Sequence, residues 1–545
     1  MLKLLMKRTA RIVFAMVIFA LAQFPCFAQN NGDAPNQQAS SADQQIPPAI
    51  AKELDAMRKR IDELEAELKN AKAPERPTTP ATSAKATVPV APFSAAPAAP
   101  VTTTAESATS AKSTADAAAP AKIEPFSDAD WTWLNGNPRT KEIFWDSKFF
   151  TPEIRADTVY VYDFNHPTDH SMGGSSELFR TQEVQLEQLG VGGDFHYDNV
   201  RARLMTQFGM YSATTPRNDP SPGHGQWDLV SAYRYLSEAY GGYHFDKLQG
   251  INVDAGIFLS YIGLFSYYNF DNWAYQPSYV SSNTPWFFEG VRVQIFPTAH
   301  LKIEPWFING WQSYASANHR PGLGGQIKWT PKPWINVISN NYGLGRDDLF
   351  IANRRRIHTD NSVEIKYFDR PERTLDKMAF SLTADAGCEY GGGVSCYGDH
   401  AGGPKQSFLG FMLYNRFWFH HDLFGVTLGG GKINNPGRYL VLLPPINGAT
   451  AISGTPYFTE NPGDPYKAWD ISGTFDWMPS QYITFRWEIN HRRANVPYFS
   501  GPGGITPPGG NQGAPGSQVI INGVPWTPDL RKYENRGTIA ILVKF

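Results

Sequence analysis

The last ten residues of the chain, Arg536 to Phe545, constrain the fold more than any other stretch. They read R-G-T-I-A-I-L-V-K-F. Side chains alternate between the two faces of a strand, and about ten residues tilted by roughly 45° cross the hydrocarbon layer of a bilayer. The segment fits either a lipid-facing strand or a buried strand of a soluble sandwich. The face suited to lipid holds Gly537, Ile539, Ile541, Val543 and Phe545, and the other face holds Thr538, Ala540, Leu542 and Lys544.

Residues 1–28 have the layout of a secretory signal peptide. Lys3, Lys7, Arg8 and Arg11 precede an apolar run over 12–22, and small residues occupy the −3 and −1 positions of a cleavage site after Ala28. The apolar run is about half of the roughly 20 residues that a spanning helix needs. A secreted chain without such a helix reaches a membrane only if its strands close into a barrel.

A heptad pattern follows a polar segment, 29–48, that we expect to be disordered. Residues 49–72 carry apolar side chains at alternating spacings of four and three, which is typical of a coiled coil. In a parallel assembly Glu53 would face Arg58 of a neighbouring chain, and Arg60 would face Glu65. A single solvated amphipathic helix is the alternative, because three heptads are marginal alone. The expected core positions are Ile50, Leu54, Met57, Ile61, Leu64 and Leu68.

Residues 73–125 are rich in Ala, Pro, Thr and Ser and cannot bury enough apolar surface to fold. We expect an extended linker. At about 3 Å per residue it could carry the coil on the order of 100 Å from the rest of the chain.

Residues 126–545 combine few charges with many aromatic residues and glycines, which suits amphipathic strands joined by Gly- and Pro-rich loops. Seven short turns alternate with eight longer loops, and this count predicts an all-β fold, a transmembrane antiparallel β-barrel of about 16 strands. Short turns are expected at 198–199, 246–250, 297–300, 331–333, 369–376, 420–422 and 479–480, and loops near 165–180, 213–228, 263–285, 313–320, 345–356, 389–404, 434–465 and 494–528.

The expected strands alternate between charged and apolar side chains, as a barrel with a polar interior requires. In the strand 182–197 the alternation changes phase, and a bulge near Gly190 would restore the register. The mixture of inward charges predicts a general pore with at most a mild anion preference. The predicted pore-lining residues are Arg201, Arg203, Arg234, Glu238, Arg292, Lys302, Glu304, Lys328, Glu364, Lys366, Arg486, Glu488 and Arg492.

Once the signal peptide is removed, Cys388 and Cys396 remain. An even pair in an oxidising compartment, separated by a Gly-rich turn, predicts a disulfide that closes one loop. A metal site would need further ligands, and we expect none.

Two stretches resemble known outer-membrane proteins. A chain that stops at Phe545 resembles the closing strand of a bacterial outer-membrane β-barrel, in which a terminal Phe is the barrel-assembly signal. The stretch F-D-N-W-A-Y-Q-P-S-Y-V-S-S-N-T-P-W-F-F-E-G-V-R-V, followed by P-W-F-I-N-G-W, resembles β-barrel porins of the OmpL-like family. This resemblance implies a porin without indicating its solute. The layout of coil, linker and barrel is also similar to phosphate-selective porins, although the inward faces here lack a run of lysines.

No catalytic constellation or cofactor site emerges from the sequence. Gly429-Gly430-Gly431-Lys432 lacks the other residues of a phosphate-binding loop, and His420-His421-Asp422 falls in an expected turn. We therefore expect no enzyme, but an outer-membrane porin for passive diffusion of small hydrophilic solutes, with its amino-terminal segment in the periplasm. An anion-selective channel, or an envelope anchor that holds a periplasmic tether, is the alternative. The expected partners are the bilayer, the barrel-assembly machinery and further copies in a homo-oligomer, with a trimer favoured, and no nucleic acid.

Overall fold

The chain, seen in a computed structural model, divides into two compact units, residues 1–112 and 113–545. The predicted signal peptide, the coiled-coil core and almost all of the linker lie outside the described residues. The structure describes Lys59 and residues 125–172, 177–216, 219, 221, 225–316, 320–343, 353–391, 393–398, 405–437, 465–508, 510 and 520–545.

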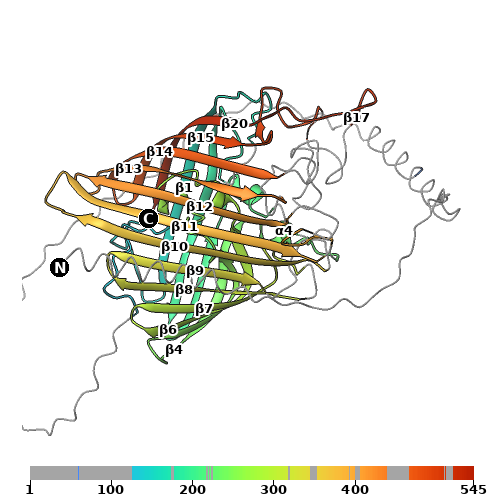
Figure 1. Ribbon diagram of the computed structural model, residues 1–545. Helices are drawn as coiled ribbons and strands as arrows, with labels where there is room; N and C mark the ends of the chain where they lie inside the picture. Colours follow the sequence, from blue (N-terminus) through green and yellow to red (C-terminus); the bar gives the residue numbers. More distant parts are fainter. Residues whose placement is uncertain are drawn as a thin grey trace, which may run out of the picture. The chain divides into compact units, whose positions relative to one another are not determined.

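Sixteen antiparallel strands close into a barrel, as the sequence predicts, and β1 pairs with the last strand, β20 (Figure 1). Every strand of the barrel pairs with its neighbours in sequence order. The strands are β1 (Phe150–Asp163), β2 (Val184–Tyr197), β3 (Val200–Thr206), β4 (Leu236–Phe245), β5 (Ile251–Leu259), β6 (Phe287–Thr298), β7 (Leu301–Ile308), β8 (Gly322–Lys332), β9 (Ile335–Gly343), β10 (Arg355–Asp369), β11 (Leu375–Tyr390), β12 (Ser407–Phe419), β13 (Phe424–Asn435), β14 (Tyr466–Ser480), β15 (Ile483–Ala494) and β20 (Tyr533–Lys544).

Short turns and long loops alternate around the barrel at the predicted places. Seven connections, from 198–199 between β2 and β3 to 481–482 between β14 and β15, are short, and the eight others are longer. The short connections therefore gather at one end of the barrel and the long loops at the other. We call these the short-turn end and the long-loop end.

The terminal strand shows which face of the wall is turned toward lipid. In β20 the side chains of Ile539 and Ile541 are 50% and 45% exposed, whereas those of Ala540 and Leu542 are buried. Phe545 is also exposed and stacks on Tyr482 at 5.5 Å between ring centroids. The outward face is the one that suits lipid, so the terminal segment is a membrane strand and not a strand of a soluble sandwich.

Two local predictions need correction. The irregularity in β2 lies at Glu187, because Asp157 pairs with Gln188 and Thr158 pairs with Leu186. It therefore lies three residues before the expected Gly190, but it has the expected effect on the register. Arg234 does not lie on a barrel strand, since β4 begins only at Leu236.

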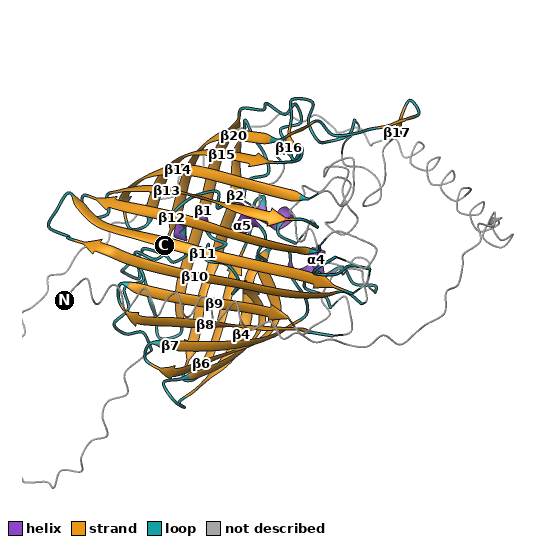
Figure 2. Ribbon diagram, viewed as in Figure 1, coloured by secondary structure: helices purple, strands orange, loops and turns teal. Residues whose placement is uncertain are grey.

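The long loops contain short helical and extended elements (Figure 2). These are α3 (Tyr211–Thr214), α4 (Leu229–Tyr233), η2 (Asn269–Asp271), α5 (Tyr279–Ser282), and the paired short strands β16 (Phe499–Ser500) with β19 (Leu530–Arg531) and β17 (Ile520–Ile521) with β18 (Val524–Pro525). Arg234 follows α4, whose first turn is capped by the Asp228 side chain. Among the described residues, no helix is both long enough and apolar enough to span a bilayer.

Candidate functional site in the barrel lumen

The loop between β5 and β6, residues 260–286, folds into the lumen, and we call it the inward loop. Almost all of its residues are buried, including the polar side chains of Asn269, Asn272 and Gln276. A loop on the protein surface would expose such groups to water. Their burial instead indicates that the barrel wall and other lumen segments surround the loop.

Carboxylates on the wall hold the backbone of the inward loop. Glu488 of β15 accepts hydrogen bonds from the amides of Tyr275 and Gln276, at 2.6 and 3.0 Å. Asp470 of β14 accepts a hydrogen bond from the Ser278 hydroxyl at 2.5 Å. Buried amides need acceptors, and ionised acceptors make the stronger hydrogen bonds. These contacts fix the loop to the side of the lumen that lies away from β5 and β6.

A second set of contacts ties the inward loop to β1. Arg155 donates to both carboxylate oxygens of Asp271 at 3.1 Å, and its guanidinium lies 4.0 Å from the centre of the Tyr268 ring. Asp157 accepts hydrogen bonds from Asn269 and Tyr275, both at 2.9 Å. The loop is therefore held along much of its length and not only at its two ends.

Residues 126–141, which precede the first strand, also lie within the barrel, and we call them the N-terminal segment. The Phe126 amide donates to Ala299 in the β6–β7 turn, and the Trp133 indole donates to Pro333 in the β8–β9 turn. At its other end, Arg139 donates to the carbonyls of Ser480 and Ile483, which flank the β14–β15 turn. The β6–β7 and β14–β15 turns lie on opposite sides of a sixteen-stranded barrel, so the segment crosses the short-turn end.

Buried anchors hold the middle of the N-terminal segment. Trp133, Leu134 and Asn135 are at most 2% exposed, and the Asn135 amide donates to Glu364 of β10 at 2.8 Å. Asp130 pairs with Lys366 at 3.1 Å. Burial raises the pKa of the Asp130 carboxyl, but hydrogen bonds from Thr132 and the Lys366 ammonium outweigh burial, and the pKa lies below its usual value.

The N-terminal segment and the inward loop support each other. The Trp273 amide donates to the Asn135 side-chain oxygen at 2.8 Å, and the Gly136 amide donates to the Asp271 carbonyl at 3.1 Å. Gly136 has φ +72°, and a Cβ there would lie 2.2 Å from the carbonyl oxygen of Leu264. Only glycine allows the two backbones to approach so closely.

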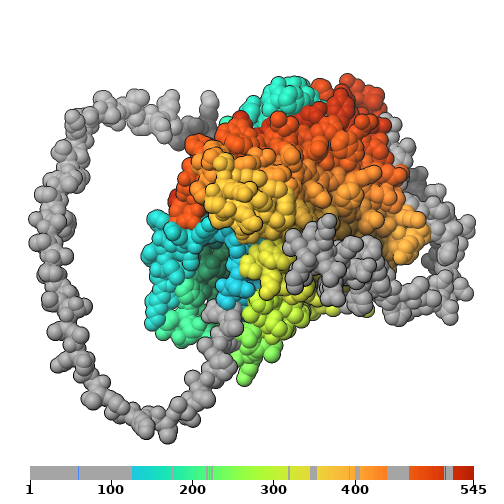
Figure 3. Space-filling model, turned by 60° about the vertical axis from the view of Figure 1, so that its left-hand side comes forward, coloured from blue at the N-terminus to red at the C-terminus, as the bar shows by residue number. Residues whose placement is uncertain are grey.

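The wall formed by β2 to β5 leaves open space in the lumen at the short-turn end. A cavity of about 330 Å³ lies there, and Figure 3 shows a hollow bordered by cyan and teal residues on this side of the barrel. The inward side chain of Asp194 is 52% exposed, that of His244 36% and that of Arg201 32%. We call this space the vestibule. Its lining includes Asp194, His196, Arg201, Tyr240, His244 and Asn252.

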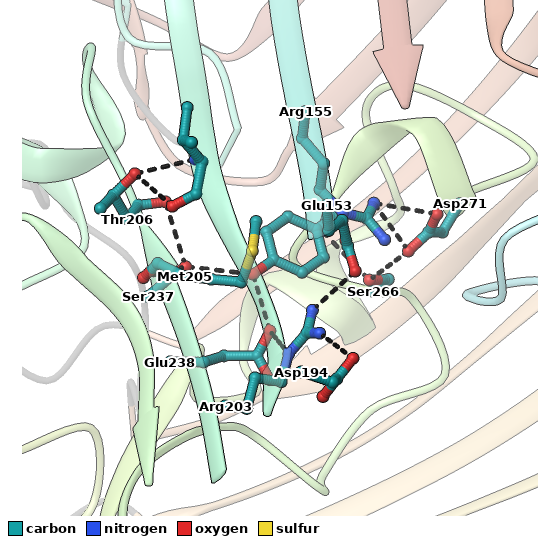
Figure 4. A network of polar contacts seen from close by, with 12 residues as sticks. Glu153, Arg155, Asp194, Arg203, Met205, Thr206, Ser237, Glu238, Ser266 and Asp271 are labelled. Atoms are coloured by element: carbon teal, nitrogen blue, oxygen red, sulfur yellow. Dashed lines mark hydrogen bonds and ion pairs between the residues drawn. The ribbon is translucent and has the colours of Figure 1, made fainter. Parts of the chain in front are cut away.

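A charged network lies at the edge of the vestibule, between the wall and the inward loop (Figure 4). The Arg203 guanidinium contacts three carboxylates: Asp194 at 2.8 Å, Glu238 at 2.9 Å and Glu153 at 3.0 Å. Glu153 also pairs with Arg155, and Glu238 accepts a hydrogen bond from the Tyr268 hydroxyl at 2.8 Å. The network therefore links four neighbouring strands to the inward loop.

The predicted pore-lining residues fall into three groups. Arg201, Arg203 and Glu238 lie at or near the vestibule. Arg234 lies beyond the strands and donates to the Ser212 carbonyl. The remaining residues are on inward faces but are mostly covered by the inward loop, the N-terminal segment or their own ion-pair partners: Arg292, Lys302, Glu304, Lys328, Glu364, Lys366, Arg486, Glu488 and Arg492.

The members of the network on β1 and β2 were not among the predicted pore-lining residues. Glu153, Arg155 and Asp157 alternate with Ile154 and Ala156, so the period of two was visible. Asp194 was not predicted to face inward, because the alternation of inward and outward side chains along β2 changes phase at Glu187. Asp271 lies in a loop, where no periodicity shows which way a side chain points.

The structure also places the predicted disulfide, the glycine-rich stretch and the histidine-containing turn. A disulfide joins Cys388, on β11, to Cys396 in the following loop. The Gly429–Lys432 stretch lies within β13, and His420, His421 and Asp422 form the turn before it. Asp422 pairs with Lys377 at 2.6 Å, which gives it a structural role. Within the described ranges, no group of three or more His, Cys, Asp or Glu side chains is arranged to hold a metal ion.

Comparisons with solved structures find other bacterial barrels at low sequence identity. OmpT of Vibrio cholerae is 8% identical, with 74% of this chain and 100% of that chain covered and a TM-score of 0.42. The outer membrane channel DcaP of Acinetobacter baumannii is 11% identical, with coverage of 74% and 99% and a TM-score of 0.40. OprB of Pseudomonas putida is 10% identical, with coverage of 73% and 94% and a TM-score of 0.41. No curated protein sequence matches the chain.

A family profile covers most of the barrel. The profile described as "Putative beta-barrel porin-2, OmpL-like" matches residues 155–521, from the first strand into the last long loop. The match includes the inward loop and the stretch that resembles OmpL-like porins. With a closed sixteen-stranded wall, this match identifies an outer-membrane channel protein, and the chain belongs to the OmpL-like β-barrel porin family.

Proposed function

We propose that the barrel conducts small hydrophilic solutes by passive diffusion, through a lumen narrowed by the inward loop and the N-terminal segment. The observation that carries this proposal is the vestibule beside β2 to β5, where charged side chains remain exposed to solvent. Sixteen-stranded porin walls enclose an aqueous channel. The buried inward loop on the other side of the lumen would set the size limit for solutes.

The inward charges favour a weakly selective pore. Because most of them are paired with an opposite charge, the net field along the lumen is small. The inward faces of the strands also carry charged residues that were not among the predicted pore-lining residues, and more of these are acidic than basic. We therefore propose a mild cation preference in place of the expected mild anion preference. The added acids are Glu153, Asp157, Asp163, Glu187, Asp194, Asp254, Asp360, Asp385, Glu389, Asp470, Asp476 and Glu534, and the added bases are Arg155, Arg356, Arg416, Arg536 and Lys544.

The proposed orientation places the short-turn end in the periplasm, because outer-membrane barrels have short periplasmic turns and longer outer loops. The N-terminal segment crosses that end, and the residues before it would then extend into the periplasm. Phe545, at the same end, is proposed as the residue that the barrel-assembly machinery recognises. No catalytic role is proposed for any residue.

A structural anchor is the second candidate. It is favoured by the N-terminal segment, whose contacts to three turns would hold the barrel against a pull on the preceding chain. We also propose that the coil at 49–72 is parallel and strengthens a trimer. Replacing Ile61 and Leu64 with Asp should weaken association of the amino-terminal segment and leave the barrel folded.

Recordings of the purified full chain in planar bilayers separate the two candidates. A porin gives steady single-channel conductance in several salts. The absence of conductance from folded, correctly inserted protein would support the anchor and contradict the channel.

A further inference from the structure

A group of polar side chains lies on the outward face of β9 and β10, where the wall faces lipid. It consists of Ser339, Asn341, Thr359 and Asn361, and we call it the polar patch. Alternation fixes the direction of these side chains, because their neighbours Asn340 and Asp360 are buried on the lumen side.

The polar patch lies within the apolar wall and not at its rim. Along β10 it is flanked by Ile357, which is 38% exposed, and by Val363. Ile327 on β8 and Leu382 on β11, 46% and 37% exposed, lie on either side of it. Polar side chains at this depth cannot be hydrated by the water beyond the membrane, so another polar group must meet their hydrogen-bonding needs.

Hydrogen bonds within the patch meet only part of that need. Ser339 donates to Asn361 at 2.7 Å, Asn341 donates to Ser339 at 3.2 Å, and Asn361 donates to Thr359 at 2.9 Å. Each Asn amide carries two donor hydrogens and an acceptor oxygen. Among the described residues, no hydrogen bond uses the Asn341 side-chain oxygen, the second hydrogen of either amide or the Thr359 hydroxyl hydrogen.

The strands on either side leave room for a partner to approach. Gly325 of β8 pairs with Asn341, and Ala384 and Ala386 of β11 pair with Asn361 and Thr359. These four strands are adjacent in the wall (Figure 1). Small residues beside polar ones allow close contact and hydrogen bonding between membrane segments. On β15 and β20, by contrast, the outward face carries Trp487, Ile489 and Ile541, all at least 40% exposed.

We propose that the outward face of β8 to β11 is the surface through which barrels of this chain associate, and that the polar patch lies at its centre. A second copy of the chain fits best, because amide and hydroxyl groups are donors as well as acceptors and the patch therefore complements itself. Association would satisfy the remaining donors and acceptors and remove them from lipid. This inference goes beyond the proposed channel, since each barrel encloses its own lumen.

The test measures the mass of the full chain, extracted in a mild detergent, by native mass spectrometry. We expect the unmodified chain to be oligomeric. In the N341L/N361L double variant, the ratio of oligomer to monomer should be at least tenfold lower. Leucine suits lipid, so the variant barrel should fold and show the usual mobility shift on heating before electrophoresis. The matched control is Thr158→Leu, the same kind of change on the outward face of β1.

A steric pair provides an independent check. Ala384→Trp places a large side chain on the proposed surface, where lipid tolerates it and a protein neighbour does not. Gly537→Trp is its control, because the outward face of Gly537 opens onto empty space. An unmodified chain that is monomeric in detergent and cannot be cross-linked in its membrane would overturn the proposal. An N341L/N361L variant that assembles as fully as the unmodified chain would also overturn it. The same holds if Gly537→Trp abolishes assembly and Ala384→Trp does not. Single-barrel conductance tests the channel separately.

Discussion

The side chain of Asn135 accepts a hydrogen bond from the Trp273 amide at 2.8 Å, although the two residues are 138 positions apart. This contact joins the N-terminal segment to the inward loop inside the barrel. Neither element belongs to the wall, and each buries polar groups that the other helps to satisfy. Their conformations are therefore coupled, and loosening one should loosen the other.

Replacing Asn135 with Leu should release the N-terminal segment and disturb the inward loop. The variant leaves the buried Trp273 amide without its acceptor, which costs about 1–3 kcal/mol and raises the open population by roughly 5- to 150-fold. Hydrogen exchange of 126–141 and 260–286, followed by mass spectrometry, should show faster exchange in both. Asn137→Leu is the control, since among the described residues the Asn137 side chain bonds within its own segment, to the Asn135 carbonyl. Faster exchange confined to residues near 135 would contradict the coupling.

Glu488→Gln should loosen the inward loop without removing its anchor completely. The Tyr275 and Gln276 amides donate to different oxygens of Glu488, so glutamine keeps an acceptor for only one of them and turns an NH2 donor toward the other. The bond that remains is also weaker, because a hydrogen bond to a charged group is worth about 1.5–3 kcal/mol and a neutral one about 1. We expect larger open-channel noise and a higher mean conductance in bilayer recordings. Glu304→Gln is the matched control, because in the described part of the chain the polar partners of Glu304 are Lys302, Gln294 and Trp306, none of which belongs to the inward loop. Equal noise in both variants would argue against the loop as the constriction.

Acid should undock the N-terminal segment through Asp130. Its pKa in the docked state is below the ordinary 3.8. The carboxylate therefore stabilises docking above that value, and this contribution is lost as pH falls through the docked-state pKa. Lys366, which also pairs with Asp369 at 2.7 Å, keeps its charge over this range.

Hydrogen exchange of 126–141 measures this effect. Its protection, corrected for the intrinsic pH dependence of exchange, should fall below pH 3.8. Asp130→Asn should show weaker protection at neutral pH and a smaller acid step. An acid step of unchanged size in Asp130→Asn would assign the effect to another carboxylate.

The wall could be predicted from the sequence because its determinants are local. A period of two in side-chain polarity and the composition of short turns depend on neighbouring residues only, and both identify strands wherever the period is unbroken. Errors arose where a local feature broke that period. The irregularity at Glu187 changed the phase of β2. The capped turn of α4 kept Arg234 outside β4, although the alternation continued through it.

The contents of the lumen could not be predicted in the same way. The inward loop is held by pairs such as Arg155 with Asp271 and Tyr275 with Glu488, which are 116 and 213 positions apart. Nothing in the sequence near Asp271 shows which basic residue it will meet. The N-terminal segment was likewise included in the barrel region 126–545, but its path across the short-turn end depends on turns that distant strands bring together.

Removing the disulfide should leave the barrel intact. Cys388 and Cys396 are eight positions apart, so their bond closes a short loop and contributes at most about 3 kcal/mol. Cys388 also keeps its pairing with Ser407 and Ile357 in the neighbouring strands. The C388S/C396S variant should show the same shift in mobility on heating and similar conductance. Thiol labelling of the unreduced, unmodified chain should find no free cysteine after signal removal, and efficient labelling would refute the bond.

Arg203→Gln should make the channel more selective for cations. Arg203 is the shared partner of Glu153, Asp194 and Glu238, and its loss leaves three carboxylates facing each other beside the vestibule. One unit charge about 8 Å from the solute path, in a medium as polar as water, is worth about 0.5 kcal/mol, with opposite sign for cations and anions, so the ratio of cation to anion permeability should rise by roughly fivefold. Reversal potentials in a potassium chloride gradient measure this ratio. Arg493→Gln removes the same charge from the exposed end of β15 and should leave the ratio unchanged. An equal shift in both variants would indicate a general effect of net charge, and no shift in Arg203→Gln would place the conducting path away from β2 to β5.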